Sequence, residues 1–222
     1  MKKNDIKNIQ GAIFDLDGTI LDSMFIWNEI GYKFLENKNI QVPPGTDEEF
    51  TKMSLQQAAE YYIEHFDNTA TIEGIINDIN KLVESFYFYE VVKKKGIEEF
   101  LEFLKNKGVK MCVATATDKY MVEKALERNG ILHYFSEIFT CNGVGAGKDT
   151  PVIYEKSLQH LGTSKEKTYV FEDALYAIET ANKAGFHVVG IKDVSEKADP
   201  DTIKNLCDVF IEDYEEIYNY FQ

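Results

Sequence analysis

The segment Gly11–Thr19, which reads GAIFDLDGT, decides both the fold and the kind of site to expect. A short apolar run typical of a buried strand ends in Asp15 and Asp17, and Gly18 follows at once. Carboxylates at the end of a buried strand must be hydrated, neutralised or bound to a cation. Ligands of open α/β sheets bind just outside the carboxyl ends of the strands. The pattern therefore favours metal-assisted chemistry over a loop with two surface aspartates.

The composition suits a globular α/β protein, either one domain or a core domain with a modest insertion. The chain has 222 residues, of which 44% are hydrophobic and 13% aromatic, enough to fill a sizeable core. Its 24 basic and 38 acidic residues give a formal net charge of −14, which repels nucleic acid and anionic membranes. We therefore expect neither partner, and a phosphate site in this chain would need a cation and a nearby lysine.

The cysteines and the start of the chain bear on where the protein works. Cys112, Cys141 and Cys207 include no close pair, so they indicate neither a zinc site nor a disulfide framework. The first residues do not resemble a signal peptide, and no segment is long enough to span a bilayer. We therefore expect a cytoplasmic protein. We also expect a monomer, because no long apolar surface stripe stands out.

After Gly96 the sequence alternates helix and strand patterns with short connections. The predicted strands cover residues 109–115, 137–141, 168–171, 187–191 and 208–211. The predicted helices cover residues 97–107, 151–161, 174–184 and 200–206, with a further helix that Asp118 caps and that ends at Arg128, and a terminal helix. Strands that alternate with helices imply a parallel sheet covered on both faces. The sequence thus predicts a Rossmann-like three-layer α/β core.

Residues 23–92 interrupt this alternation and contain helical patterns, with a turn predicted at residues 43–45. We predict an all-helical insertion here, which leaves the chain after the first strand and returns before the second. Residues 1–22 and 93–222 then form the core. The return segment, residues 91–96, is short, charged and ends in glycine, as expected of a hinge.

Three further features fall where strands of such a sheet would end. Thr115 ends the second predicted strand, Lys148 follows a glycine-rich loop, and Glu172 and Asp173 end an apolar strand. Each has an ordinary structural explanation: a hydroxyl bonded to backbone, a solvated loop lysine, and carboxylates that cap the next helix. Because the carboxyl ends of parallel strands lie at one edge of a sheet, all of them converge with the first two aspartates, and a shared site is the better interpretation.

Together these features resemble the haloacid dehalogenase superfamily of aspartate-nucleophile phosphotransferases. The matching stretches are Phe14–Thr19, Thr115, Gly147–Lys148 with Pro151, and Phe171–Ala174. Their order and spacing are similar over essentially the whole chain, including a helical cap domain between the first two. Within the superfamily, the chain resembles the phosphatase and beta-phosphoglucomutase-like subgroup.

The resemblance implies a role for each polar residue in phosphoryl transfer. Asp15 is expected to be the nucleophile that forms an aspartyl-phosphate, which splits one difficult displacement into two easier ones. Asp17 is expected to act as general acid toward the leaving oxygen and then as general base for water. Thr115 is expected to donate a hydrogen bond to a phosphoryl oxygen, and Lys148 to neutralise charge on it.

The resemblance also implies a Mg²⁺ cofactor. Asp15, Asp173 and the backbone carbonyl of Asp17 are the expected metal ligands, and Glu172 is expected to support the metal directly or through water. An all-oxygen site with retained waters suits Mg²⁺. The cation would also offset the repulsion between a phosphate and a protein of negative charge.

Gly18, Ala116 and Trp27 are the expected substrate-binding positions. Gly18 permits a tight turn after the first strand. Trp27 follows this turn closely and is a candidate to line the mouth of the site. The alternative for Trp27 is core packing, because it stands at helical spacing with Ile30 and Phe34.

The leading hypothesis is therefore a Mg²⁺-dependent phosphatase acting on a small phosphorylated metabolite. Asp17 argues against haloacid hydrolysis, because dehalogenase members of the family lack an acid at that position. A sugar phosphomutase is a second hypothesis, which Lys52 and Leu55 disfavour because they stand where a cap glycine and arginine would be expected. A non-catalytic ligand-binding protein of the same fold is a third.

Overall fold

The computed structural model describes residues 6, 8–41 and 55–221. The chain divides into two compact units, one formed by residues up to Asp22 and from Val91 onward, the other by Ser23–Glu90. Among the residues that the structure describes, no helix combines the length and the apolar character needed to cross a membrane.

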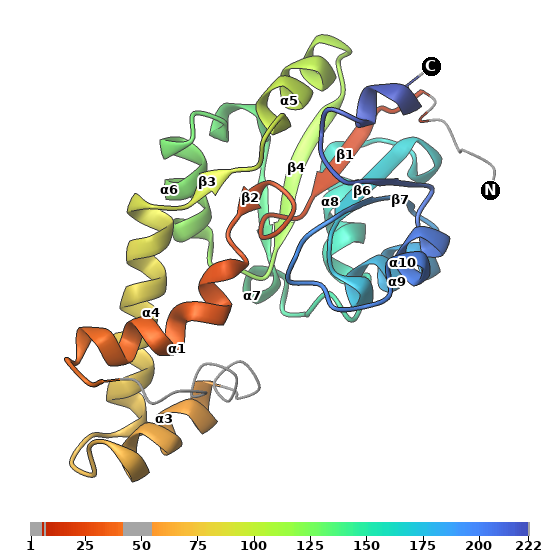
Figure 1. Cartoon of the computed structure of the whole chain (residues 1–222). Helices are drawn as coiled ribbons and strands as arrows, with labels where there is room; N and C mark the ends of the chain where they lie inside the picture. The colour runs from red at the N-terminus through yellow and green to blue at the C-terminus, as the bar shows by residue number, and fades with distance from the viewer. Residues whose placement is uncertain (1–5, 7, 42–54, 222) are drawn as a thin grey trace. The chain divides into compact units, whose positions relative to one another are not determined.

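The larger unit is built on a parallel sheet in which the described residues contribute six strands, in the order β5-β4-β1-β6-β7-β8 (Figure 1). The strands are β1 (Gly11–Phe14), β4 (Lys110–Thr115), β5 (Ile138–Thr140), β6 (Thr168–Glu172), β7 (His187–Ile191) and β8 (Val209–Ile211). Every neighbouring pair is parallel. The predicted α/β fold class is confirmed, and β1 lies between β4 and β6.

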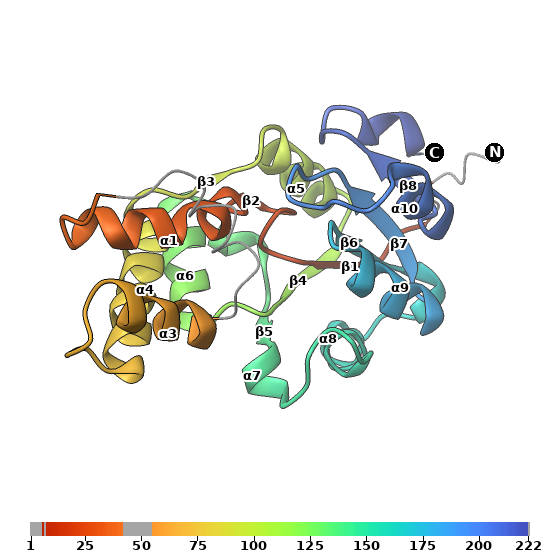
Figure 2. The same ribbon diagram turned by 60° about the horizontal axis from the view of Figure 1, so that its bottom comes forward.

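Helices cover both faces of this sheet (Figure 2). The main ones are α5 (Ile97–Asn106), α6 (Lys119–Arg128), α8 (Val152–Leu161), α9 (Leu175–Lys183) and α10 (Pro200–Leu206), and the short elements are α7 (Cys141–Val144), η1 (Leu132–Tyr134), η2 (Lys165–Lys167) and η3 (Ile217–Tyr220). The predicted terminal helix is the short 3₁₀ segment η3. Helices α8 and α9 lie on one side of the sheet and α5 on the other.

The two faces of the sheet have different cores, because successive strand side chains point in opposite directions. Ile13 and Val170 belong to the hydrophobic cluster under α8 and α9. Their sequence neighbours Phe14 and Phe171 stack with ring centroids 4.3 Å apart on the opposite face. There Phe100 of α5 lies 5.6 Å from Phe171 and is fully buried. Burial on both faces explains why β1 and β6 are continuous apolar runs.

A two-stranded antiparallel ribbon marks the place where the chain leaves the larger unit and returns to it. Strand β2 (Leu21–Asp22) pairs with β3 (Val92–Lys93). The end of α6 holds the ribbon: Asn129 Oδ1 accepts from the Lys93 amide at 2.9 Å, and the Arg128 guanidinium donates to the Val91 carbonyl. Strands of two residues carry no periodic pattern, so the ribbon could not be read from the sequence.

The described part of the smaller unit is helical. It contains α1 (Phe25–Asn37), α3 (Leu55–His65) and α4 (Ile72–Tyr89). An edge-to-face contact of 5.2 Å between Phe25 and Phe86 joins α1 to α4, and Phe34 packs on Tyr62 of α3 at 5.1 Å. Thr71 caps α4 by accepting from the Gly74 amide at 3.2 Å. The predicted turn at residues 43–45 and the position of Lys52 lie outside the described residues, as do the side chains of Trp27 and Leu55.

The predicted N-cap of α6 is confirmed in position but not in its hydrogen bond. Asp118 stands at the N-cap position of α6, but its side chain makes no hydrogen bond to the amides of the first turn. Its Oδ1 instead accepts from Asn142 Nδ2 at 2.9 Å. The carboxylate therefore ties the start of α6 to the short helix α7 that precedes the Lys148 loop.

Truncating Phe100 to alanine should destabilise the larger unit by about 3–5 kcal/mol, because the fully buried ring leaves a cavity among aromatic neighbours. Urea unfolding followed by circular dichroism measures the change. Tyr89→Ala is the control, since that side chain is 73% exposed and its loss should stay within about 0.5 kcal/mol. Equal effects of the two substitutions would contradict the assignment of Phe100 to the core.

Candidate active site

Strand register places the first and fourth motifs side by side at the carboxyl edge of the sheet. Phe14 is paired with Val113 on one side and with Phe171 on the other. Asp15 follows directly, and its amide donates to the Phe171 carbonyl at 2.9 Å. The connections that follow β1 and β6 lead to opposite faces of the sheet, so their ends border a crevice of the kind in which α/β proteins bind ligands.

Lys148 lies at the centre of the site. Its ammonium donates to Asp15 Oδ1 and, at 2.6 Å, to Glu172 Oε1, and the residue is only 5% exposed. The short helix α7 precedes the loop that carries Lys148. Thr140 caps this helix, and Gly145 ends the helix with a φ of +76°. The burial and the two partners exclude the alternative interpretation of Lys148 as a solvated loop lysine.

Three carboxylates form a set of oxygen donors beside this lysine. Asp15, Glu172 and Asp173 each place one carboxylate oxygen within 4.8 Å of the others, and all three residues are buried. One ammonium cannot balance three carboxylates, so the ionised cluster carries a net charge of −2. Buried charge of this kind calls for a cation, and a hard oxygen donor set fits Mg²⁺. The donor set includes the side chains of three of the four predicted metal residues.

The electrostatics of the cluster follow from this crowding. Burial, and then the charge of Glu172, raises the pKa of Asp15 well above its usual range. Burial followed by the charges of Glu172 and Asp15 does the same to the pKa of Asp173. Burial alone would lower the pKa of Lys148. The charges of Asp15 and Glu172 outweigh the effect of burial, so the pKa of Lys148 lies above its ordinary value. Lys148 is therefore the fixed positive charge of the site.

Glu172 has structural partners on both of its oxygens. Besides Lys148, Oε1 accepts from the buried Tyr154 hydroxyl at 3.2 Å. Oε2 accepts from the amides of Asp173 and Ala174 at 2.9 and 3.3 Å. The side chain thus orients the lysine and binds two amides of the turn that precedes α9. The alternative in which these carboxylates cap α9 is not confirmed, because the N-cap residue is Ala174 and no side chain caps the helix. Tyr154 was not identified from the sequence, because nothing in a helical pattern marks one buried tyrosine as a partner of a distant carboxylate.

Asp17 is separated from the carboxylate cluster and has a partner of its own. Its Oδ2 accepts from the Thr117 hydroxyl at 2.6 Å. The Thr117 amide in turn donates to the fully buried Thr115 Oγ1 at 3.0 Å. Thr115 therefore shapes the turn that presents Thr117, and the exposed Ala116 lies between them. Thr117 was not predicted as a site residue, and the run of hydroxyl side chains at the end of β4 is the sequence feature that could have indicated it.

Gly18 is required by close packing as well as by backbone conformation. Its φ is +79°, and a Cβ built there would lie 2.2 Å from Asp173 Oδ2. The next residue, Thr19, is fully buried and donates to Asp173 Oδ1 at 3.2 Å. The turn after β1 thus presses against Asp173. The structure brings Asp15, Lys148, Glu172 and Asp173 into one cluster and sets Gly18 against it. Asp17, Thr115 and Ala116 are linked through Thr117 instead, and the Trp27 side chain lies outside the described residues.

Comparison with known sequences finds a family model described as haloacid dehalogenase-like hydrolase, which matches residues 12–191. A phosphorylated carbohydrates phosphatase of Thermotoga maritima is 24% identical over 177 residues, which are 80% of this chain and 82% of that protein. Fructose-1-phosphate phosphatase YqaB of Escherichia coli is 26% identical over 190 residues, 82% of this chain and 96% of that protein.

Solved structures show the same fold. A Thermotoga maritima protein provisionally named a beta-phosphoglucomutase has a TM-score of 0.82 and 24% identity, covering 95% of this chain and 97% of that one. CbbY of Rhodobacter sphaeroides, crystallised with phosphate, has a TM-score of 0.72 and 19% identity, covering 94% and 96%. At these identities the likeness concerns the fold.

Replacing Asp173 with asparagine should stabilise the metal-free protein at alkaline pH, where the carboxyl group is ionised. The pKa of Asp173 is raised by burial and by its acidic neighbours, so its ionised form opposes folding above that pKa. As the pH is lowered into the acid range, the wild-type carboxyl takes up a proton and the gain in stability should shrink. Urea unfolding in EDTA at the two pH values measures both effects.

The exposed Asp201 provides the control, because Asp201→Asn removes a carboxylate that is not in the cluster. It should show no comparable gain that depends on pH. A loss of stability for Asp173→Asn at the higher pH would contradict the electrostatic description of the cluster.

Proposed function

This chain belongs to the haloacid dehalogenase-like hydrolase family, and we propose that it is a Mg²⁺-dependent phosphatase acting on a small phosphorylated metabolite. The observation that carries the proposal is the buried Lys148, which is held between Asp15 and Glu172 beside a set of three carboxylate donors. A carboxylate, a fixed cation and a metal-binding cluster in contact are what phosphoryl transfer through an aspartate requires.

In the proposed site, Asp15, Asp173 and the backbone carbonyl of Asp17 hold Mg²⁺, and Glu172 supports it directly or through water. When bound, the cation supplies charge neutralisation for the phosphoryl oxygens and for the clustered acids. The net charge of −2 on the cluster and its all-oxygen composition support this assignment.

In the first step, an Asp15 oxygen attacks phosphorus and the bond between phosphorus and the leaving oxygen breaks, which forms an aspartyl-phosphate. Lys148 binds a phosphoryl oxygen and limits the build-up of negative charge. Thr115, Gly18 and Ala116 bind the transferred group. The Thr115 hydroxyl accepts from the Thr117 amide and keeps its own hydrogen for a phosphoryl oxygen.

Asp17 moves the protons. It donates a proton to the leaving oxygen in the first step and takes one from a water molecule in the second, as that water attacks phosphorus and releases Asp15 and inorganic phosphate. The short hydrogen bond from Thr117 supports this role, because it holds the Asp17 carboxyl in one orientation.

The helical unit, Ser23–Glu90, serves as the cap that excludes water and selects the substrate, with Trp27 as a proposed substrate contact. The relatives named for phosphorylated carbohydrates and for fructose 1-phosphate support a phosphorylated sugar as the class of substrate. A screen of phosphate release over sugar phosphates, phosphoglycolate and nucleoside monophosphates identifies the compound.

Asp15→Asn should abolish hydrolysis of p-nitrophenyl phosphate in the presence of Mg²⁺, because the amide cannot attack phosphorus. We expect a loss of roughly a thousandfold or more in kcat. Wild-type protein treated with EDTA should also lose turnover and regain it when Mg²⁺ is added. Turnover close to wild type in Asp15→Asn would refute the mechanism.

The same assays separate the other two hypotheses. A phosphomutase would move phosphate between sugar hydroxyls faster than it releases inorganic phosphate. A binding protein would retain a phosphorylated ligand without turnover of any phosphoester in the screen.

Thr117→Val should lower kcat by roughly tenfold, because Asp17 then loses the hydroxyl that orients it. Thr117→Ser keeps the hydroxyl and should stay within about threefold of wild type. Steady-state kinetics over a range of pH measure both variants. Equal kcat in the valine and serine variants would show that the hydrogen bond has no part in proton transfer.

A further inference from the structure

A buried ion pair lies outside the carboxylate cluster, in the same unit of the protein. Lys94 Nζ is 2.7 Å from Asp193 Oδ2, and only 16% of the lysine side chain and 2% of the aspartate side chain are exposed. The next residue, Lys95, forms a pair with Glu215 in which both side chains are largely exposed, at 82% and 61%. Buried pairs are costly to break, whereas exposed pairs contribute little.

Lys94 connects the ribbon to the turn that touches Asp173. It follows β3 directly, and its amide donates to the Ile20 carbonyl at 2.8 Å. Ile20 adjoins Thr19, whose hydroxyl donates to Asp173 Oδ1. The Lys94 ammonium also donates to the Lys192 carbonyl at 3.2 Å. One residue therefore bonds both to the turn after β1 and to the loop after β7.

Asp193 organises that loop. Its Oδ1 accepts from the Ser195 amide and hydroxyl at 2.9 and 2.7 Å. Farther along, Glu196 accepts from the Ala198 amide at 2.7 Å and from the Leu175 amide at 2.9 Å. Leu175 is the first residue of α9, two positions after Asp173. The loop after β7 is thus fastened to the segment that carries Asp173.

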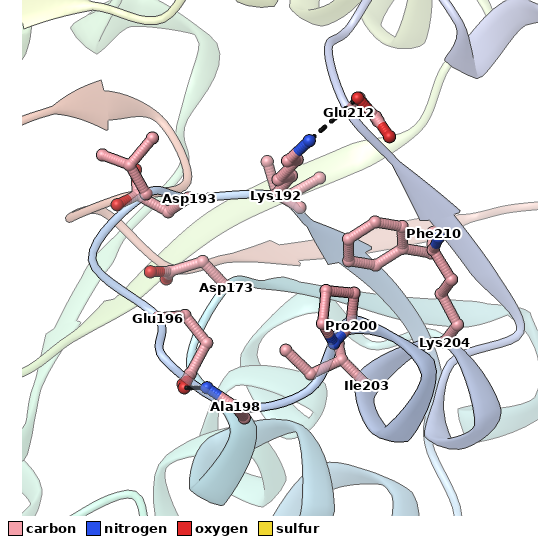
Figure 3. A pocket seen from close by; sticks show the side chains of 12 residues that line it. Asp173, Lys192, Asp193, Glu196, Ala198, Pro200, Ile203, Lys204, Phe210 and Glu212 are labelled. Carbon is pink, nitrogen blue, oxygen red and sulfur yellow. Dashed lines mark hydrogen bonds and ion pairs between the residues drawn. The ribbon is translucent and has the colours of Figure 1, made fainter.

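A pocket of about 370 Å³ lies beside this loop, with Asp173 and Asp193 both in its wall. Figure 3 shows Asp173 and Asp193 on one side of the pocket and Phe210 and Pro200 on the other. The charged groups around it have contacts of their own: Lys192 pairs with Glu212 at 3.0 Å, Lys204 Nζ lies 5.4 Å from the centroid of the Phe210 ring, and the carboxylates of Asp193 and Glu196 are bonded as described above. The lining therefore points to a structural role for these bonds rather than to a second ligand.

Two chains of bonds thus run from the Lys94–Asp193 pair to Asp173, one through Ile20 and Thr19, the other through the loop after β7, Glu196 and Leu175. We propose that Lys94 and Asp193 are positioning residues that set the Asp173 carboxylate against Asp15 and thereby set the Mg²⁺ affinity of the site. This inference rests on the proposed function, because it assigns a role at that site. Neither residue touches the reacting groups.

The test compares Lys94→Met and Lys94→Arg with Lys95→Met, the neighbouring exposed lysine, as the matched control. Lys94→Met should raise the Mg²⁺ concentration for half-maximal activity by roughly tenfold and lower kcat at fixed Mg²⁺ by a similar factor, with KM for p-nitrophenyl phosphate changed less than about threefold. Lys94→Arg keeps the charge and should recover most of the loss. Lys95→Met should match wild type.

Asp193→Asn keeps the lysine bonded to the Lys192 carbonyl and covers the case in which Lys94→Met fails to fold. It should weaken Mg²⁺ activation in the same direction by roughly threefold. Combining Asp193→Asn with Thr19→Ala should give less than the product of the single effects, because both act through Asp173. Independent, multiplicative effects, or wild-type Mg²⁺ dependence in Asp193→Asn and in folded Lys94→Met, would overturn the proposal.

A measurement without turnover separates this inference from the proposed function. Titration calorimetry with Mg²⁺ alone should show weaker binding to Asp193→Asn and to Lys94→Met than to wild type and Lys95→Met. Absence of phosphatase activity in wild-type protein would refute the proposed function, whereas equal Mg²⁺ affinity in these four proteins would refute the positioning role.

Discussion

The contact of the Lys148 ammonium with Asp15 and Glu172 is the interaction on which the rest of the site depends. Burying three charged groups is costly, and the cost is offset only where the geometry is good and the remaining polar atoms have partners. Here Tyr154 and the amides of Asp173 and Ala174 complete the environment of Glu172. The loop that carries Lys148 therefore has to place the ammonium between Asp15 and Glu172.

The same contact explains the need for a second cation. Lys148 balances one charge of three, which leaves the Asp15, Glu172 and Asp173 cluster negative within a protein of net charge −14. Burial strengthens this repulsion and raises the pKa of Asp15 and Asp173. Such a site would repel a phosphoryl group until a divalent cation neutralised it, so the proposed metal binding and substrate binding would be linked by electrostatics.

Close packing holds the Asp173 carboxylate in a fixed position. A Cβ at Gly18 would collide with Asp173, and Thr19 donates to the same carboxylate. The turn after β1 is in turn bonded to Lys94, and Lys94 to the buried Asp193. In our proposal, residues that do not touch the reacting groups thereby act on a metal ligand, which is the usual way in which surrounding hydrogen bonds tune a metal site.

The sequence by itself determined the α/β class and the strand ends, because periodicity is a local signal. It also singled out Asp15, Asp17, Glu172 and Asp173 as candidates at strand ends, while the role expected of Lys148 came from the family resemblance. Only the tertiary structure decided that Lys148 is buried, that Thr117 holds Asp17, and that Lys94 pairs with Asp193. These contacts join residues 133, 100 and 99 positions apart. Their formation depends on strand order and loop path, which no local pattern encodes.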